Sequence, residues 1–161
     1  AFKSFPEITQ VNTALAEKGL PVVFCCIKKA RRNHVREVAA QLFKDEALRQ
    51  LKVLIFLEDL LDVSHVADAV WRFSNNLDPK RDHLLIHPTV DGEVSHVVFD
   101  GTRKTKEFDG FERDWPNIVC SDEATIQRVD EIWSKLGLGE FVASPSARYR
   151  KFMYGSGAVA S

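Results

Sequence analysis

The sequence predicts an α/β layered domain with a largely parallel sheet flanked by helices. Short apolar runs of strand length alternate along the chain with segments whose apolar residues recur at helical spacing. Runs that are apolar throughout suit strands covered on both faces, as in parallel sheets. At 161 residues the chain has room for one domain with a substantial core. We therefore expect a single domain over residues 1–155 and a flexible tail of small residues over 156–161.

The first predicted element is a helix that opens at Ser4 and ends at Gly19. Ser4 and Glu7 have the spacing of a capping box, and glycine is a common residue just after a helix. The apolar stripe of this helix would consist of Ile8, Val11, Ala14 and Leu15.

Buried strands and amphipathic helices then alternate. The predicted strands cover residues 22–27, 53–57 and 83–87. One helix is capped by Asn33, and the next begins near Asp62 and stops before Asp78-Pro79, because a residue preceding proline avoids helical angles. The expected inward faces are Val35, Val38, Ala39, Leu42 and Phe43 in the first helix, and Val66, Ala69, Val70 and Phe73 in the second.

The last third of the chain has shorter elements. Asp91-Gly92 is a tight-turn signal, and strands are expected at residues 96–99 and 117–120. Asp122 caps a helix whose apolar face would be formed by Ile126, Val129, Trp133 and Leu136. A final helix is expected to start at Ser144-Pro145 and to end at Gly155.

Composition excludes several classes of function. The formal net charge is −1, and the basic segment 28–32 has no interleaved aromatics, so we expect a solvated loop there rather than a phosphate or nucleic-acid site. Three cysteines cannot form a disulfide framework, which indicates a reducing compartment and hence the cytoplasm. No stretch reaches the ~20 apolar residues of a membrane span. The start at Ala1 without methionine indicates a fragment or a processed piece.

Familiar catalytic patterns are missing. The sequence has no glycine-rich nucleotide loop after the first strand and no histidine or cysteine spacing typical of a metal site, so no metal ligand and no catalytic residue is assigned. Cys120 lies just before a helix start, but Ser121-Asp122 as a helix entry explains that position without chemistry. Glu58 and Asp59 end a strand, yet adjacent strand residues point to opposite faces.

The segment 100–104 is the best candidate for a site. A strand ending in Asp100 is followed by Thr102, Arg103 and Lys104, which could present donors to a phosphate or carboxylate. The alternative is that Asp100 and Thr102 stabilise the turn while the cations are solvated. The residues alone leave both interpretations open.

Three blocks in a fixed order resemble a known family. They are WRFSNNLDPKRD at residues 71–82, FDGTRK at residues 99–104 and FERDWP at residues 111–116. Together with a later helix containing Trp133, they resemble the C-terminal domain of UbiD-type carboxy-lyases over roughly residues 53–141. Gly101 stands where the family commonly has alanine.

The resemblance implies a place in a larger enzyme. Full-length members of the family are non-oxidative decarboxylases of aromatic or α,β-unsaturated acids that use prenylated FMN with a divalent metal, in some branches for quinone biosynthesis. In that setting this chain would contact the flavin-binding domain and form homo-oligomers, and it would bind no cofactor by itself. Phe99 is the candidate for the wall of the substrate pocket, with Trp71 and Phe73 as weaker candidates.

The final predicted helix is a candidate interface. Its aromatic, methionine and arginine residues are typical of protein contacts, although docking on its own domain would explain them equally well. The interface candidates are Arg148, Tyr149, Phe152 and Met153.

Two hypotheses from different classes follow. The first is an assembly and pocket-wall domain of a UbiD-type decarboxylase that is inactive in isolation. The second is a stand-alone α/β module that binds an anion or small molecule at the strand ends near residues 100–104. Nucleic-acid binding through residues 28–32 would require a steeply salt-dependent affinity.

Overall fold

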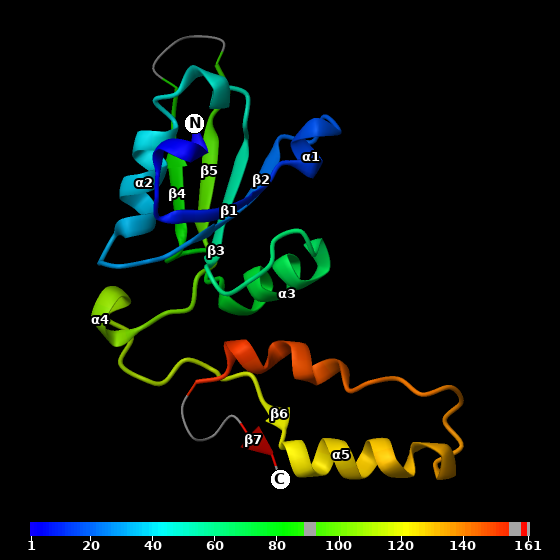
Figure 1. The fold of residues 1–161 in the computed structure, drawn as a ribbon. Helices are drawn as coiled ribbons and strands as arrows, with labels where there is room; N and C mark the ends of the chain where they lie inside the picture. Colours follow the sequence, from blue (N-terminus) through cyan, green and yellow to red (C-terminus); the bar gives the residue numbers. More distant parts are fainter. Residues whose placement is uncertain (89–92, 155–158, 161) are drawn as a thin grey trace. The chain divides into compact units, whose positions relative to one another are not determined.

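A computed structural model of the chain describes residues 1–88, 93–154 and 159–160 (Figure 1). The chain separates into two compact units, Ala1–Trp115 and Pro116–Ser161. The predicted turn at Asp91-Gly92 lies outside the described residues, as does most of the predicted tail. The prediction of one domain over residues 1–155 stays a prediction.

The first unit is built on a five-stranded mixed sheet in the order β1-β2-β3-β5-β4. The strands are β1 (Ile8–Asn12), β2 (Val22–Ile27), β3 (Val53–Glu58), β4 (His83–Ile86) and β5 (His96–Asp100). The three central strands β2, β3 and β5 are parallel, whereas the edge strands β1 and β4 pair antiparallel to their neighbours. The predicted α/β class with flanking helices is therefore confirmed, with antiparallel strands at both edges.

Helix α2 (His34–Leu42) covers one face of this sheet (Figure 1). Its buried face packs into the core cluster with alternate residues of the central strands. The members of this cluster from α2 and the strands are Val23, Cys25, Ile27, Val35, Val38, Ala39, Leu42, Leu54, Phe56 and Val98. The intervening residues Phe24, Cys26, Ile55 and Leu57 are also buried, so both faces of the central strands are covered as the apolar runs predict.

The prediction of an N-terminal helix over residues 4–19 is wrong. This segment contains the short 3₁₀ helix η1 (Phe2–Ser4), strand β1 and the one-turn helix α1 (Ala14–Glu17). β1 includes the β-branched Ile8, Thr9 and Val11 and pairs with β2 along its length except at Thr9, where the register shifts, so the tertiary context outweighs the capping signal. Gly19, with φ +83°, does follow the end of α1.

Helix α3 (Val66–Asn76) ends before Asp78-Pro79 as predicted, but a different face of it is buried. The expected inward residues Val66 and Val70 are 37% and 45% exposed. Ala69 is buried as expected, but it shares its buried helical face with Arg72 and Asn76 rather than with the two valines. Arg72 and Asn76 bond to Glu58 at the end of β3. The orientation of α3 is therefore set by these polar contacts rather than by the burial of its valines.

Short 3₁₀ and α-helical turns complete the first unit. They are η2 (Glu46–Leu48) between α2 and β3, and α4 (Lys106–Asp109) after β5. α4 is capped at one end by the Thr105 side chain, which accepts from the Phe108 amide, and ends at Gly110 with φ +66°.

The second unit has little regular structure. It contains β6 (Cys120–Ser121) parallel to β7 (Val159–Ala160), helix α5 (Glu123–Ile132), and the 3₁₀ segments η3 (Trp133–Lys135) and η4 (Pro145–Phe152). Asp122 caps α5 as predicted, since its carboxylate accepts from the Thr125 amide. The predicted strand at 117–120 is reduced to its last residue, and the predicted final helix is of the 3₁₀ type. None of the residues of α5 is buried.

Candidate functional site

The predicted segment 100–104 lies at the centre of a group of charged side chains, which we call the lysine–aspartate cluster. Its members are Lys29, Arg81, Asp82, Asp100, Lys104 and Asp109. They come from the loop after β2, the segment before β4, the end of β5 and helix α4. All of them belong to the first unit.

Lys104 is the most buried cation of this cluster, with a side chain 1% exposed. Its ammonium donates to the Asp100 carbonyl at 2.6 Å, to Asp100 Oδ1 at 3.1 Å and to the Thr102 carbonyl at 2.8 Å. Asp82 Oδ1 lies 3.6 Å away. Burial lowers the pKa of Lys104 below its ordinary 10.5, and the attraction of Asp100 and Asp82 only partly offsets this.

Lys29 is the second buried cation, and the expectation of a solvated basic loop is wrong for this residue. Its side chain is 9% exposed. It reaches Asp109 Oδ1 at 2.5 Å, Thr102 Oγ1 at 3.2 Å and Asp100 Oδ2 at 3.3 Å. A carboxylate pair on two distant segments therefore pulls this lysine out of the basic run and into the interior.

The carboxylate of Asp100 is held ionised by these neighbours. Burial by itself would raise the pKa of Asp100, but the charges of Lys104 and Lys29 and the hydrogen bonds from Thr102 outweigh it, so the pKa lies below the ordinary 3.8. Thr102 donates to Asp100 Oδ1 through both its amide, at 3.0 Å, and its hydroxyl, at 2.5 Å. Asp100 and Thr102 therefore stabilise the turn, as one of the two interpretations of the sequence expected. The other half of that interpretation, that the cations of this segment are solvated, is wrong for the buried Lys104.

A second polar group, the Glu58 cluster, lies at the end of β3 and consists of Glu58, Arg72, Asn76 and Trp115. Arg72 donates to Glu58 Oε1 through Nε at 2.8 Å and through a terminal nitrogen at 2.5 Å. Asn76 donates to the Gly101 carbonyl at 3.0 Å and accepts from the Trp115 indole at 2.9 Å. The sequence analysis missed Arg72, Asn76 and Trp115. The feature that could have indicated this cluster is Glu58, an acidic residue at the end of a buried strand.

Glu58 also connects the two clusters, because its Oε2 accepts from the Arg103 amide at 3.2 Å. The ends of β3 and β5, helix α3 and the segment leading to Trp115 are therefore joined by internal bonds. In the described part of the first unit, these side chains satisfy one another, and we find no nucleophile paired with a base. The geometry fits structural support rather than acid–base chemistry.

The predicted pocket-wall residues lie close to one another. The rings of Phe99 on β5 and Phe73 on α3 form an edge-to-face pair with centroids 5.4 Å apart, and both side chains are half-buried. Trp71, on the same helix, is 37% exposed and lies beside the Arg72 guanidinium at 5.4 Å. The roles of these residues in a pocket stay predictions.

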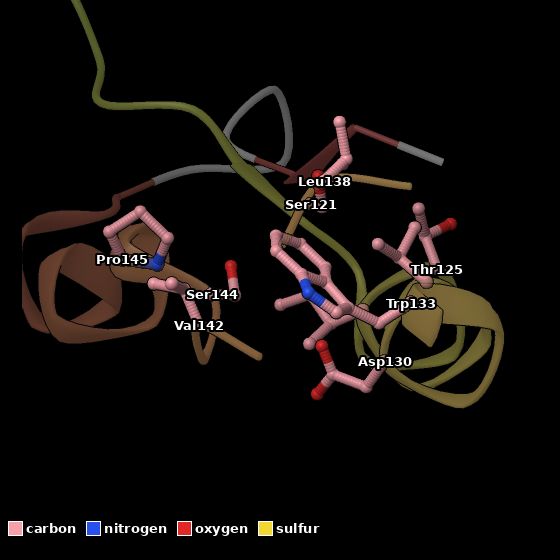
Figure 2. A pocket seen from close by; sticks show the side chains of 10 residues that line it. Ser121, Thr125, Asp130, Trp133, Leu138, Val142, Ser144 and Pro145 are labelled. Atoms are coloured by element: carbon pink, nitrogen blue, oxygen red, sulfur yellow. The ribbon is translucent and has the colours of Figure 1, made fainter. Parts of the chain in front are cut away.

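The second unit contains an apolar groove of about 510 Å³ between α5 and the segment that returns to η4. Figure 2 shows Trp133 directed between the α5 side and the side that carries Val142 and Pro145. The lining residues are Ser121, Thr125, Ile126, Val129, Asp130, Trp133, Leu138, Val142, Ser144 and Pro145. Sequence reasoning missed Leu138 and Val142, which are 64% and 58% exposed.

The predicted interface residues lie near this groove in the chain but not in its lining. Arg148 lies over the Tyr149 ring at 4.7 Å, and Tyr149 lies 6.4 Å from Phe152 between ring centroids. Phe152 is 6% exposed, whereas Tyr149 and Met153 are half-buried and Arg148 is exposed. Their part in an interface stays a prediction.

Two observations bear on whether the described residues could hold the metal or the flavin that the resemblance implies. Across the described ranges, no three His, Cys, Asp or Glu side chains are grouped to hold a metal ion. The groove of the second unit has no lysine or arginine in its lining, so it does not fit the phosphate of a flavin. We therefore assign no chemical step to a cofactor on this chain. The described helices also include none that is long and apolar enough to span a membrane.

Comparison with known families identifies the chain. The family model described as "3-octaprenyl-4-hydroxybenzoate carboxy-lyase C-terminal domain" matches residues 1–101, which is more than half of the sequence. The chain belongs to this family. The matched range begins earlier than the resemblance over residues 53–141 indicates, and it ends at Gly101 within the first unit.

Curated relatives of the chain are much longer than the chain itself. A protein of Aquifex aeolicus is 30% identical over 146 residues, which cover 84% of this chain and 29% of the relative. A protein of Archaeoglobus fulgidus is 25% identical over 141 residues, covering 81% of this chain and 29% of the relative. Both carry the description "Uncharacterized protein". The chain thus spans less than a third of these relatives.

Solved structures of UbiD-class enzymes share the fold. The vanillic acid decarboxylase of Sedimentibacter hydroxybenzoicus in its closed form superposes with a TM-score of 0.63 at 16% identity, covering 84% of this chain and 30% of that one. An evolved dimeric form of HmfF from Pelotomaculum thermopropionicum, in complex with prFMN, gives 0.52 at 14% identity, covering 70% and 24%. At these identities the likeness concerns the fold alone.

Proposed function

We propose that this chain acts as an assembly and pocket-wall domain of a UbiD-type decarboxylase that removes CO₂ from an aromatic or α,β-unsaturated acid. The observation that carries the proposal is the family match over residues 1–101, in a chain that covers only 29% of its relatives. A flavin-binding domain with prenylated FMN and a divalent metal would supply the chemistry. Quinone precursors are one substrate class for such an enzyme, and the cytoplasm is its expected location.

The paired charges in the interior of the first unit support the proposal that this chain is inactive by itself. The charged groups at the strand ends are paired with one another, and Thr102 and Lys104 are each 2% exposed. A residue that is buried and bonded on several sides is held in place and cannot easily accept a proton from a substrate. The alternative, a stand-alone module that binds an anion through residues 100–104, would have to break these internal bonds.

The apolar groove of the second unit supports the assembly part. Its lining includes the exposed Leu138 and Val142, and Leu136 and Phe141 close by in sequence are 43% and 57% exposed. Contiguous apolar surface of this kind marks interaction sites in soluble proteins. The occupant that we propose is another protein surface, from a second copy or from the flavin-binding part of the enzyme.

The pocket-wall role can be tested in the assembled enzyme. Replacing Phe99 by Ala removes a half-buried ring while Phe73 keeps the neighbouring space partly filled. If Phe99 contacts substrate, Phe99→Ala should raise KM for aromatic acids about tenfold, because a buried aromatic contact contributes roughly 1–2 kcal/mol. The assay is decarboxylation by the enzyme containing the flavin domain, next to this chain alone, which should give no turnover.

A matched control is Phe43→Ala, a half-buried ring after α2 that stacks on His96. An equal change in KM for both variants would argue against a specific role of Phe99. Turnover or bound flavin in this chain alone would overturn the assembly-domain proposal and favour the stand-alone module.

A further inference from the structure

A small charged cleft in the first unit is not used by the proposed function. It has a volume of about 130 Å³ and lies between the first turn of α2, the segment before β4 and helix α4. Its lining combines four cations with three carboxylates: Lys29, Arg32, Arg36, Arg81, Asp82, Asp100 and Asp109. Lys104 adds a fifth cation behind Asp82 and Asp100, so the cleft carries a surplus of two positive charges.

The three carboxylates of the cleft are already neutralised. Asp82 accepts a two-pronged pair from Arg81 at 2.8 and 2.7 Å, and Asp100 and Asp109 are paired with Lys29. In contrast, no ion pair joins Arg32 or Arg36 to a carboxylate anywhere in the described ranges. Arg36 is held beside the cleft by a hydrogen bond to the Arg81 carbonyl at 3.0 Å. The surplus charge therefore resides on these two guanidinium groups.

Neutral donors lie on the same side of the cleft. Asn33 and Val35 are among the lining residues and belong to the start of α2. The Asn33 side chain makes no capping bond to its own helix, so its amide group is available to a ligand. The positive end of the nine-residue helix adds to the field of the arginines.

The size of the cleft limits its ligand. A volume of about 130 Å³ corresponds to roughly four water molecules in the liquid, which suits a compact oxyanion and is too small to enclose a flavin or a nucleoside. Guanidinium groups approaching from a loop and from a helix match an anion with several oxygens better than a single carboxylate. We propose that this cleft binds a phosphate group, with Arg32 and Arg36 as its direct ligands.

This site is distinct from the alternative that placed an anion on residues 100–104. Asp100 and Lys104 are paired within the protein, with Asp100 held by Lys29 and Lys104, whereas the proposed phosphate ligands are Arg32 and Arg36. The proposal does not depend on the assembly role. A phosphate group could be a free ion or part of a phosphorylated metabolite, and the cleft recognises the chemistry that the two share.

The test is a titration of the isotopically labelled chain with inorganic phosphate at constant ionic strength, followed by amide chemical shifts. Saturable shifts should appear at Asn33, Val35 and Arg36. Arg32→Ala, at an exposed position without a carboxylate partner, should weaken binding about tenfold, the loss typical of one charge-assisted contact. Arg49→Ala, at another exposed arginine that lies outside the cleft, should leave affinity unchanged.

Two results would overturn the proposal: the absence of saturable binding, or equal weakening by Arg32→Ala and Arg49→Ala. The second result would show a response to net charge rather than a site. A parallel titration with glycerol 3-phosphate distinguishes the sources. Tighter binding of the ester supports a phosphorylated metabolite as ligand, and binding equal to or weaker than that of inorganic phosphate supports the free ion.

Discussion

The two units of the chain differ in how completely they bury their apolar side chains. The first unit encloses a core in which Phe56, Leu54 and Leu57 are completely buried, and it pairs even its interior charges. In the second unit, α5 buries none of its residues and an apolar groove remains open. A unit that satisfies its own groups can hold a shape alone, whereas one that leaves apolar surface exposed gains stability when a partner covers it.

The largest expected difference between the units concerns charge removal. Lys104→Met leaves the buried carbonyl oxygens of Asp100 and Thr102 without their ammonium donor. The first unit should lose about 2–5 kcal/mol of stability, because each buried acceptor left unsatisfied costs roughly 1–3 kcal/mol. Chemical denaturation followed by circular dichroism measures this loss.

The matched variant in the second unit is Arg150→Ala, which breaks an ion pair with Glu123 whose side chains are 38% and 60% exposed. Its cost should stay below about 1 kcal/mol, because solvent screens such pairs. Equal losses from the two substitutions would remove the contrast between the units.

A smaller effect is expected from crowding at Gly101. A Cβ at this position would lie 3.0 Å from the Phe56 carbonyl oxygen and 3.1 Å from side-chain atoms of Leu57 and Phe73. Gly101→Ala should therefore destabilise the first unit by about 1–3 kcal/mol, as overpacking usually does. Thermal unfolding measures the change, and an unaltered midpoint would show that α3 shifts freely away from β5.

Acid should weaken the first unit through Asp100. The folded-state pKa of this carboxyl lies below its ordinary 3.8, so its contribution to stability is present above about pH 4 and is lost as the pH falls through the folded pKa. Asp100→Asn should flatten the decline of unfolding free energy between about pH 5 and pH 2. An unchanged slope in this variant would mean that Asp100 gains no net stabilisation from Lys104 and Lys29.

The sequence predicts most of the sheet because a short run of apolar residues indicates a strand whose two faces are both buried. β2, β3, β4 and β5 fall at the expected places, and α2 buries Val35, Val38, Ala39 and Leu42 as expected. The N-terminal helix failed because the pairing of β1 with β2 is a long-range interaction that local capping signals cannot report.

The candidate site could be predicted only in part, for a similar reason. Asp100, Thr102 and Lys104 are neighbours in the chain, so their motif is visible. Lys29 meets Asp109 across 80 positions, and Arg72 meets Glu58 across 14, so no local pattern announces either pair. Val66 and Val70 looked like the inward face of α3 because hydrophobicity was the visible signal, while the deciding partner was Glu58.

Native mass spectrometry of the purified chain, with no cofactor added, tests most directly whether the second unit is an assembly surface. The account predicts a dimer or higher oligomer that carries no flavin mass. Leu138→Ser combined with Val142→Ser should shift it to monomer, and Leu85→Ser, at a leucine on β4 that is 52% exposed, should not. A monomer carrying a bound flavin, or an oligomer that the groove variant leaves intact, would contradict the account.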